Sequence, residues 1–547
     1  METTTFSNES LINAATDRQE VGQTPWYYVL GTCVPLAILV LFWMRDHGTK
    51  LPYLNPKGRF EWSSDRVVRE FVFNSYRMLY SSAKDFLGKP FRVLCDVGDV
   101  IILPPDVGQE IRNDKRFSFV QGLFEVRLRR GDNRGFDCST RKRLLTYMTK
   151  DFQGQYAGFE AYKEACHPSE RIQNVVKLRL TKTLGRISGI LSQEVEESLQ
   201  DTLGDSTEWH DTVAKHEILK IVSRMSSRIF VGKRLGRNEK WLSTIVGYVE
   251  LSVHAMQNLR FWPKFLRGIV VYFLPGPTKL RAYIRDAETQ VFAEIKHRQQ
   301  EGDSVEEYND AIEWFKEMAK GQKFNPAVAQ LILAGVAIHT TADLVTQTLY
   351  DILQHPELIQ PLREEAIQVI GEGGWKKTSL YNMKLMDSVL KESQRLKPNQ
   401  IVGMARRATA DVQLSDGTVI SRGSATVVSA ERMWDDKIYE NPHVFDGYRF
   451  YRERGGPNDA VSQFVSTSVN HMGFGHGMHS CPGRFFAGNE AKVLLAHMLL
   501  KYDIKFVEGQ KPKFAEFGFT RESDSDVKIS VRRRKEEIDL SVRVEEE

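Results

Sequence analysis

A glycine-rich loop near the C-terminus places one cysteine at the start of an apolar helix, and this feature constrains the chain more than any other. The loop reads FGHGMHSCPGRFFA over residues 474–487. Gly475, Gly477 and Gly483 let the backbone turn tightly and approach a flat ligand. The helix expected to follow points free N–H groups and the positive end of its dipole at the Cys481 sulfur. These features favour the thiolate, which is the form of cysteine that binds metal ions.

The loop resembles the cysteine-loop pattern Phe-x-x-Gly-x-Arg/His-x-Cys-x-Gly of the cytochrome P-450 family. It matches this pattern at Phe474, Gly477, His479, Cys481 and Gly483. The resemblance implies that Cys481 is the axial ligand of the iron of haem b, and that the other matched residues, with Gly475, hold this cofactor. His479 stands where arginine is usual, beside a haem propionate. A buried structural cysteine is the alternative for an isolated cysteine, but five matched positions favour the ligand.

Length and composition agree with a large globular enzyme. The chain has 547 residues, 41% hydrophobic and 27% charged, and its net charge of +4 is too small to indicate a nucleic-acid partner. The five cysteines, which are Cys33, Cys95, Cys138, Cys166 and Cys481, form no CxxC pair, so we expect a reducing compartment. The resemblance implies a mainly α fold with a smaller β-rich lobe (α+β), with the catalytic domain at 58–535.

An uncharged segment at residues 26–44 predicts an N-terminal transmembrane anchor. Its length is at the lower end of what spans a bilayer core of about 30 Å, and Trp26 and Trp43 lie where an aromatic belt would place them. A cleaved signal peptide fits less well, because residues 1–25 are acidic and no small-x-small cleavage site follows. Basic residues in the proline-containing hinge at 45–57 predict a cytosolic catalytic domain, a lumenal tail and a single-pass location in the endoplasmic reticulum membrane.

A long apolar helix is expected between residues 325 and 355. Asn325 is a good helix cap, and Pro326 suits the first helical position. At 1.5 Å per residue such a helix would run about 45 Å and cross the whole domain. The pattern breaks in the middle, where polar side chains at 339–341 need partners and Gly335 leaves room for a ligand.

The middle of this helix, residues 336–341, is similar to the family motif Ala-Gly-x-Asp/Glu-Thr-Thr. The resemblance implies that Thr340 is the catalytic threonine at the oxygen site. His339 replaces the acid of the motif, and we expect it to help deliver protons, because an imidazole titrates near neutrality. The alternative is a threonine hydroxyl bonded to the carbonyl one turn earlier.

Three charged residues resemble the family's Glu-Arg-Arg triad, which locks the segment before the cysteine. Glu392 and Arg395 are spaced i, i+3 on a helix, and Arg449 follows later in the chain. On an exposed helix such a pair would contribute only about 0.2–0.5 kcal/mol. If the triad is buried, losing one member strands a charge and costs about 3–5 kcal/mol.

The resemblance also assigns residues around the cofactor and the substrate. It places Arg406 at a haem propionate, where arginine suits a bidentate carboxylate contact, with the adjacent Arg407 as the alternative and Lys177 as a second partner. It places Ile401, Val402, Met404 and Phe519 in the substrate cavity.

Three further segments carry expectations of their own. Residues 92–103 predict two strands joined by a turn at Gly98. The apolar stretch 259–275 is either a segment that dips into the membrane surface or a buried core helix. The charge run at 532–537 predicts a solvated end to the domain, followed by a charged tail at 536–547.

Together these motifs identify the chain as a haem-thiolate monooxygenase by resemblance. Such an enzyme takes electrons from NADPH through a separate reductase, with cytochrome b5 as an optional second donor, and oxidises an apolar small molecule. The motif style is similar to that of fungal secondary-metabolism members, which implies a terpenoid or meroterpenoid substrate. Two alternatives stay open: an isomerase or dehydratase of the same fold, and a non-catalytic haem-binding protein.

Overall fold

The computed structural model describes residues 51–61, 63–86, 88–119, 155–165, 167, 169–260, 262–301 and 308–540. The predicted anchor at 26–44 and the tail before it lie outside these residues. The described residues belong to one compact unit that starts at Leu51.

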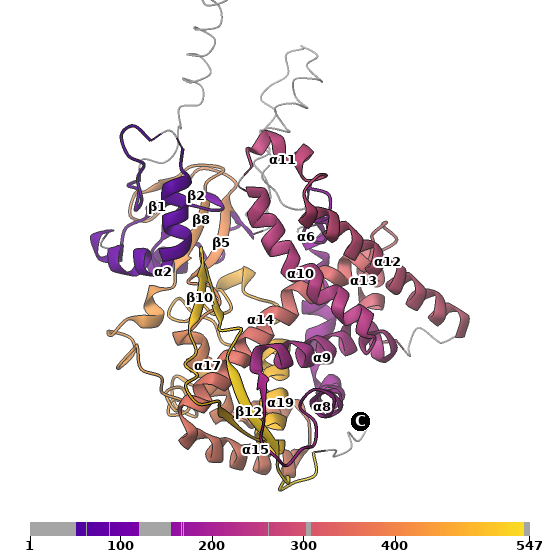
Figure 1. Ribbon diagram of the computed structural model, residues 1–547. Helices are drawn as coiled ribbons and strands as arrows, with labels where there is room; N and C mark the ends of the chain where they lie inside the picture. The colour runs from indigo at the N-terminus through magenta and orange to yellow at the C-terminus, as the bar shows by residue number, and fades with distance from the viewer. Residues whose placement is uncertain are drawn as a thin grey trace, which may run out of the picture. The chain divides into compact units, whose positions relative to one another are not determined.

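Helices make up most of this unit, as expected from the sequence (Figure 1). The long helices are α2 (Asp65–Phe86), α8 (Thr181–Leu203), α9 (Ala214–Gly236), α10 (Glu239–Arg260), α12 (Pro275–Glu301), α14 (Pro326–Gln354), α15 (Ile359–Gly373), α17 (Lys384–Leu396) and α19 (Arg484–Lys501). The short ones are α3 (Pro105–Ile111), α6 (Glu160–Ala165), α7 (Arg171–Val175), the π-helix η2 (Val176–Leu180), α11 (Lys264–Val270), α13 (Ala311–Ala319), η3 (Pro356–Leu358), α16 (Lys377–Asn382), η4 (Glu431–Trp434), α18 (Asp459–Ser462) and η5 (Gly477–His479).

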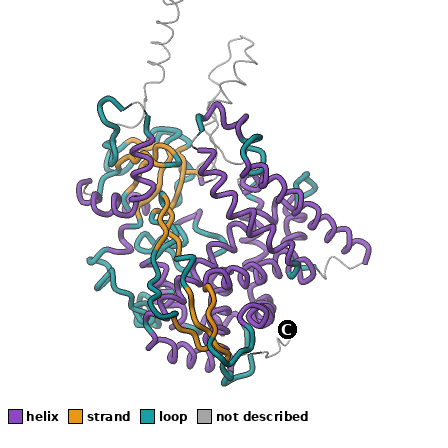
Figure 2. The backbone as a smooth tube through the Cα atoms, in the orientation of Figure 1, coloured by secondary structure: helices purple, strands orange, loops and turns teal. Residues whose placement is uncertain are grey.

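The strands gather along one side of the helices (Figure 2). The largest sheet has the order β1-β2-β8-β5-β3, formed by β1 (Phe91–Cys95), β2 (Gly98–Leu103), β8 (Ala425–Ser429), β5 (Val402–Ala408) and β3 (Phe117–Ser118). Only the β2–β8 pair among these is parallel. The hairpin predicted at 92–103 is therefore confirmed as β1 and β2.

Three smaller sheets complete the described strands. One has the order β4-β12-β9, with β4 (His210–Val213), β12 (Lys528–Arg533) and β9 (Tyr502–Phe506). The others are the pairs β10 (Phe514–Phe517) with β11 (Thr520–Ser523), and β6 (Val412–Gln413) with β7 (Val419–Ile420).

The helix α14 runs through the centre of the helical core, as the sequence predicts. Its cap is local: Asn325 Oδ1 accepts from the N–H groups of Ala327 at 3.1 Å and Val328 at 3.3 Å, and Pro326 occupies the first turn. It packs against α9, α10, α12, α17 and α19. Within the described ranges α14 alone has the length and apolarity to cross a bilayer, and most of it is buried inside the protein.

The apolar stretch at 259–275 is not a buried core helix. It divides into the end of α10, the short helix α11 and the start of α12. Ile269, Tyr272 and Phe273 are exposed, and the side chain of Phe273 is 81% accessible. The alternative of a segment at the membrane surface therefore agrees better with this part of the chain.

The charge run at 532–537, expected to be a solvated end, is part of the folded unit instead. Arg532 and Arg533 close strand β12, and Lys501 Nζ on α19 donates to Glu536 Oε1 at 2.9 Å. Burial raises the pKa of Glu536, but hydrogen bonds from Arg533 and Lys501 outweigh it and hold this pKa at about 2. The expectation was wrong because these contacts join distant strands and helices.

Candidate active site

The cysteine loop is a tight series of turns between strand-like backbone and the first turn of α19. The N–H of Cys481 donates to the carbonyl of Phe474 at 2.8 Å, and the N–H of Ser480 donates to that of Gly477 at 3.0 Å. Gly475 and Gly477 have φ angles of 69° and 78°, which favour glycine. The loop is therefore held by its own backbone, as the glycine pattern predicts.

The short helix α3 fixes the position of this loop. A Cβ built at Gly477 would lie 2.3 Å from the carbonyl oxygen of Arg112, so no larger residue fits there. The N–H of Met478 donates to this same carbonyl at 3.2 Å and to Asn113 Oδ1 at 3.1 Å. His476 Nε2 pairs with Gln109 Oε1 at 3.0 Å. Sequence reasoning missed α3, because it lies far from the loop along the chain and carries no motif.

Two opposing influences act on the Cys481 thiol. Burial raises its pKa above the ordinary value, while the N–H groups of Gly483 and Arg484 and the charge of Arg484 lower it. The N–H groups act in the direction that the helix start predicts, but the net pKa of the thiol lies above its ordinary value, and Cys481 itself is exposed to solvent. An iron bound to the sulfur would hold the thiolate, because coordination deprotonates a thiol.

Arg406, His479 and Lys177, predicted to face the propionates, share one location. The guanidinium of Arg406 lies 5.5 Å from the centre of the Phe119 ring, which stacks on His479 at 6.1 Å. Burial, together with the charges of Arg406 and Lys177, lowers the pKa of His479 to about 4. The imidazole is therefore neutral, and the cations here are Arg406 and Lys177.

Arg406 is buried with one donor unused. Its Nη1 donates to the carbonyl of Ala405 at 2.7 Å, whereas its buried Nη2 makes no hydrogen bond with any residue that the structure describes. Burial lowers its pKa to about 10. A β-bulge between Gly403 and Arg406 changes the direction of the side chains in this part of β5. A buried cation without a counter-charge is costly, so the arrangement fits a carboxylate-bearing ligand such as a haem propionate.

In the middle of α14 one face of the helix is exposed. Val336 is 51% exposed and Thr340, one turn later on the same face, is also exposed, although most neighbouring residues of the helix are buried. Thr340 Oγ1 donates to the Val336 carbonyl at 2.9 Å, which is the bond that the alternative interpretation expects. An exposed hydroxyl can exchange this bond for one to a ligand.

Two neighbours on α14 behave differently from Thr340. His339 Nε2 is buried and has no hydrogen-bond partner among the described residues. Burial lowers the pKa of His339 to about 4. A Cβ at Gly335 would lie 3.2 Å from Val249 Cγ2. The absence of a side chain at Gly335 therefore lets helix α10 pack closely against α14. The expectation that Gly335 makes room for a ligand is therefore wrong.

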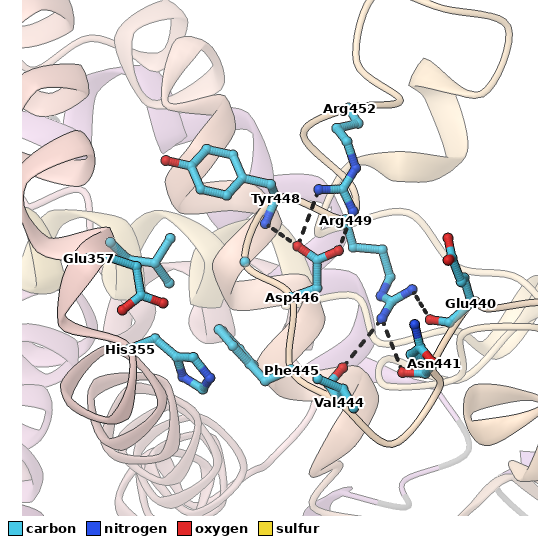
Figure 3. Close-up of a pocket in the computed structure, with 12 residues that line it drawn as sticks. His355, Glu357, Glu440, Asn441, Val444, Phe445, Asp446, Tyr448, Arg449 and Arg452 are labelled. Carbon is cyan, nitrogen blue, oxygen red and sulfur yellow. Dashed lines mark hydrogen bonds and ion pairs between the residues drawn. The ribbon is translucent and has the colours of Figure 1, made fainter.

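The three triad residues are buried together. Arg395 forms a bidentate pair with Glu392, with both N···O distances at 2.8 Å, and Arg449 Nε donates to Glu392 Oε1 at 3.0 Å. Figure 3 shows Arg449 reaching the carbonyls of Glu440, Asn441 and Val444 beside a surface pocket of about 470 Å³. The triad thus ties α17 to the segment 433–449, which precedes the cysteine loop.

A second buried carboxylate supports the triad, and no sequence motif marks it. Asp351 Oδ2 on α14 accepts from Ser393 Oγ at 2.7 Å, and Lys397 pairs with the same carboxylate. Ser393 lies next to Glu392. These bonds fix α17 against the central helix, so the triad and the oxygen-side helix are parts of one rigid assembly.

The predicted cavity residues lie together in the sheet lobe. Ile401, Val402 and Met404 are buried there, and the N–H of Ile401 donates to the carbonyl of Phe519 at 3.0 Å. Phe519 also packs its ring edge-on against Phe71, with centroids 5.2 Å apart. Their contact with a substrate stays a prediction.

Comparison with known proteins places this geometry in a family. The family profile described as Cytochrome P-450 matches residues 147–526. The chain is 42% identical to Cytochrome P-450 monooxygenase 1 of Gibberella fujikuroi, covering 82% of this chain and 99% of that protein. It is 41% identical to Cytochrome P-450 monooxygenase hepE of Aspergillus oryzae, covering 89% and 86%.

A solved structure shows the same fold. The crystal structure of the cytochrome P-450DA heme domain aligns with a TM-score of 0.61 at 16% identity, covering 89% of this chain and 98% of that one. The cysteine loop, the buried triad and the unpaired Arg406 donor agree with the cofactor that this family binds. The chain belongs to the cytochrome P-450 family of haem-dependent monooxygenases.

Proposed function

We propose that this chain is a membrane-bound monooxygenase that inserts oxygen into an apolar terpenoid or meroterpenoid. The family membership establishes haem b as the cofactor and electrons from NADPH, through a reductase, as the reductant. The observations that support the site assignment are the turns of the Cys481 loop and the exposed Thr340 on α14, a helix that packs against α19 directly after the loop. The substrate class rests on similarity to monooxygenases of fungi.

The haem, when bound, supplies the activation of dioxygen. The chain's residues do the rest. Cys481 would bind the iron through its sulfur, and Arg406 and Lys177 would neutralise the propionates, while His479 packs beside Arg406 through Phe119. Thr340 Oγ1 holds and orients a proton on the oxygen side. Triad residues Glu392 and Arg395 keep the backbone before Cys481 in place.

A recess of about 260 Å³ between η2 and the cysteine loop supports a docking site for the reductase. Lys177, Met478 and Arg484 line it, and the exposed Lys182 follows Thr181 at its rim. Cationic rims attract acidic partner surfaces and raise the rate of encounter. Reversing the charge in Lys182→Glu should raise the reductase concentration needed for half-maximal NADPH oxidation, with haem content unchanged.

The location at the endoplasmic reticulum membrane rests on the predicted anchor and on the exposed side chains of 262–273. Trp262, Tyr272 and Phe273 combine apolar and amphipathic groups that suit the lipid headgroup boundary.

The test is expression of the full chain with an NADPH-dependent reductase, followed by incubation with terpenoid precursors and mass spectrometry. We expect products that have gained one oxygen atom for each NADPH consumed. An isomer or a dehydrated product formed without NADPH would instead favour an isomerase or dehydratase. Haem binding with no turnover of any precursor would favour a non-catalytic haem protein.

A further inference from the structure

The proton supply to His339 is the open question on the oxygen side of α14. His339 precedes Thr340, yet its Nε2 is buried and no described residue bonds to it. An imidazole that passes protons must also receive them from another group. The source has to lie on the face of α14 that His339 shares.

A carboxylate lies one turn further along this face. Asp343 follows His339 at i+4, a spacing that places the Cβ atoms about 5–6 Å apart. Asp343 is buried, and its Oδ1 accepts from the backbone N–H of Ser523 at 2.8 Å and from Ser523 Oγ at 2.6 Å. Strand β11 thus holds the carboxylate beside α14.

A lysine connects this carboxylate to the surface. Lys215 Nζ, in the first turn of α9, lies 3.3 Å from Asp343 Oδ1 and donates to the carbonyl of Ser523 at 2.9 Å. The same Nζ is 3.6 Å from Glu522 Oε2, and the Glu522 side chain is 54% exposed. Polar groups therefore run from solvent through Glu522 and Lys215 to Asp343, which lies one helical turn from His339 on α14.

The electrostatics agree with this proximity. The charge of Lys215 lowers the pKa of His339, and the charge of Asp343 raises it. Tyr350 and Asp524 also face this carboxylate: the charges of Asp524 and Asp343, after burial, raise the pKa of Tyr350. At neutral pH the tyrosine therefore keeps its proton and stays outside the route.

We propose that Glu522, Lys215 and Asp343 conduct protons from solvent to His339, and that they act as positioning and relay residues for the oxygen chemistry. The inference rests on the monooxygenase function. One proton enters from water at Glu522, Lys215 gives one to Asp343 and regains it from Glu522, and Asp343 gives one to the imidazole. Each residue returns to its starting state, so the net change is one proton moved from solvent to His339. The acid missing at position 339 is thus replaced by a carboxylate one turn later, linked to solvent by α9 and β11.

The first test measures NADPH oxidation by the full-length holoenzyme with reductase, in water and in deuterium oxide, across pH. Asp343→Asn and Lys215→Met should lower the rate about tenfold, enlarge the solvent isotope effect and shift the pH profile. Glu522→Gln should have a smaller effect, because water reaches Lys215 directly. Asp343→Glu should restore most of the rate. Glu217→Gln, which removes an exposed ion pair with Lys220 on the same helix, is the matched control.

The second test measures how Asp343 and Lys215 affect the pKa of His339, and it needs no enzymatic turnover. Histidine-selective NMR of the reduced, carbon-monoxide-treated protein should give a His339 signal, assigned by its loss in His339→Gln. Its pKa should fall in Asp343→Asn and rise in Lys215→Met. Unchanged isotope effects and pH profiles in variants with full haem content would overturn the inference.

The two tests separate the failure of the inference from that of the function. If the wild-type chain oxidises NADPH but the variants match it, the monooxygenase function stands and the proton route is wrong. If the wild-type chain does not oxidise NADPH, the NMR titration still decides whether Asp343 and Lys215 act on His339. If a variant loses haem, Ser523→Ala, which removes one hydrogen bond to Asp343, takes its place in both tests.

Discussion

At the scale of single residues, the missing side chain of Gly477 decides whether the cysteine loop can close on α3. Its φ of 78° and the 2.3 Å approach of the Arg112 carbonyl to a built Cβ exclude any larger residue. Gly477→Ala should therefore lose haem and lower the melting temperature. Gly509→Ala is the control, because Gly509 has a similar φ of 80° with nothing within 4 Å of its Cβ. The control should show only the backbone strain of about 1–2 kcal/mol. Equal haem content in the two variants would contradict the role of the close approach.

A second prediction at this scale concerns Glu490 and the pH dependence of the free energy of unfolding. It is fully buried on α19, where its only described side-chain partner is Ser226 Oγ at 2.7 Å, and burial raises its pKa to about 8. The folded state therefore binds a proton that the unfolded state, with an ordinary carboxyl pKa near 4.5, has released. Stability from this group is present below pH 4.5 and is lost as the pH rises to about 8.

The variant Glu490→Gln removes this titration. Its free energy of unfolding should exceed that of the wild type by a margin that grows between pH 5 and pH 8, by about 1.4 kcal/mol per pH unit at most. Denaturant unfolding at several pH values measures the margin. Glu508→Gln, at an exposed position, should show no such growth. A margin for Glu490→Gln that is constant over this range would mean that the carboxyl titrates normally.

At the scale of elements, the triad joins α17 to the segment before the cysteine loop. Removing either Glu392 or Arg395 leaves a buried charge without its partner, which costs about 3–5 kcal/mol. We expect Glu392→Ala and Arg395→Ala to abolish haem incorporation, measured by the absorbance of the reduced, carbon-monoxide-treated protein. Glu70→Ala breaks an exposed i, i+4 pair with Arg66 and should change stability by less than about 1 kcal/mol. A triad variant with full haem content would remove the triad from this role.

At the scale of the whole molecule, we predict that the exposed apolar side chains before α12 form a second membrane contact besides the predicted anchor. Replacing Ile269 and Phe273, which are both exposed, with aspartate should weaken binding of residues 51–547 to phospholipid vesicles, measured by co-sedimentation. The cost of placing charges at the lipid boundary is the reason. A double aspartate change at exposed Val444 and Val461 is the control. Equal loss in both pairs would mean that binding is not local to this stretch.

The sequence predicted those parts of the site that depend on neighbours in the chain. The cap at Asn325, the hairpin at 92–103, the glycine turns around Cys481 and the i, i+3 spacing of Glu392 and Arg395 each follow from local backbone geometry. Local periodicity and turn chemistry determine such features, because they are set within a few residues.

Only the tertiary structure decided the rest. The contact of Gly477 with Arg112 and that of Asp343 with Ser523 join segments far apart in sequence, and no local pattern encodes them. The same holds for the charge of His479, which burial and the nearby charges of Arg406 and Lys177 keep neutral. Sequence by itself therefore determined the family, the motifs and the local turns. The packing of distant elements, which sets desolvation and long-range hydrogen bonds, decided how those motifs are held and which of their groups are charged.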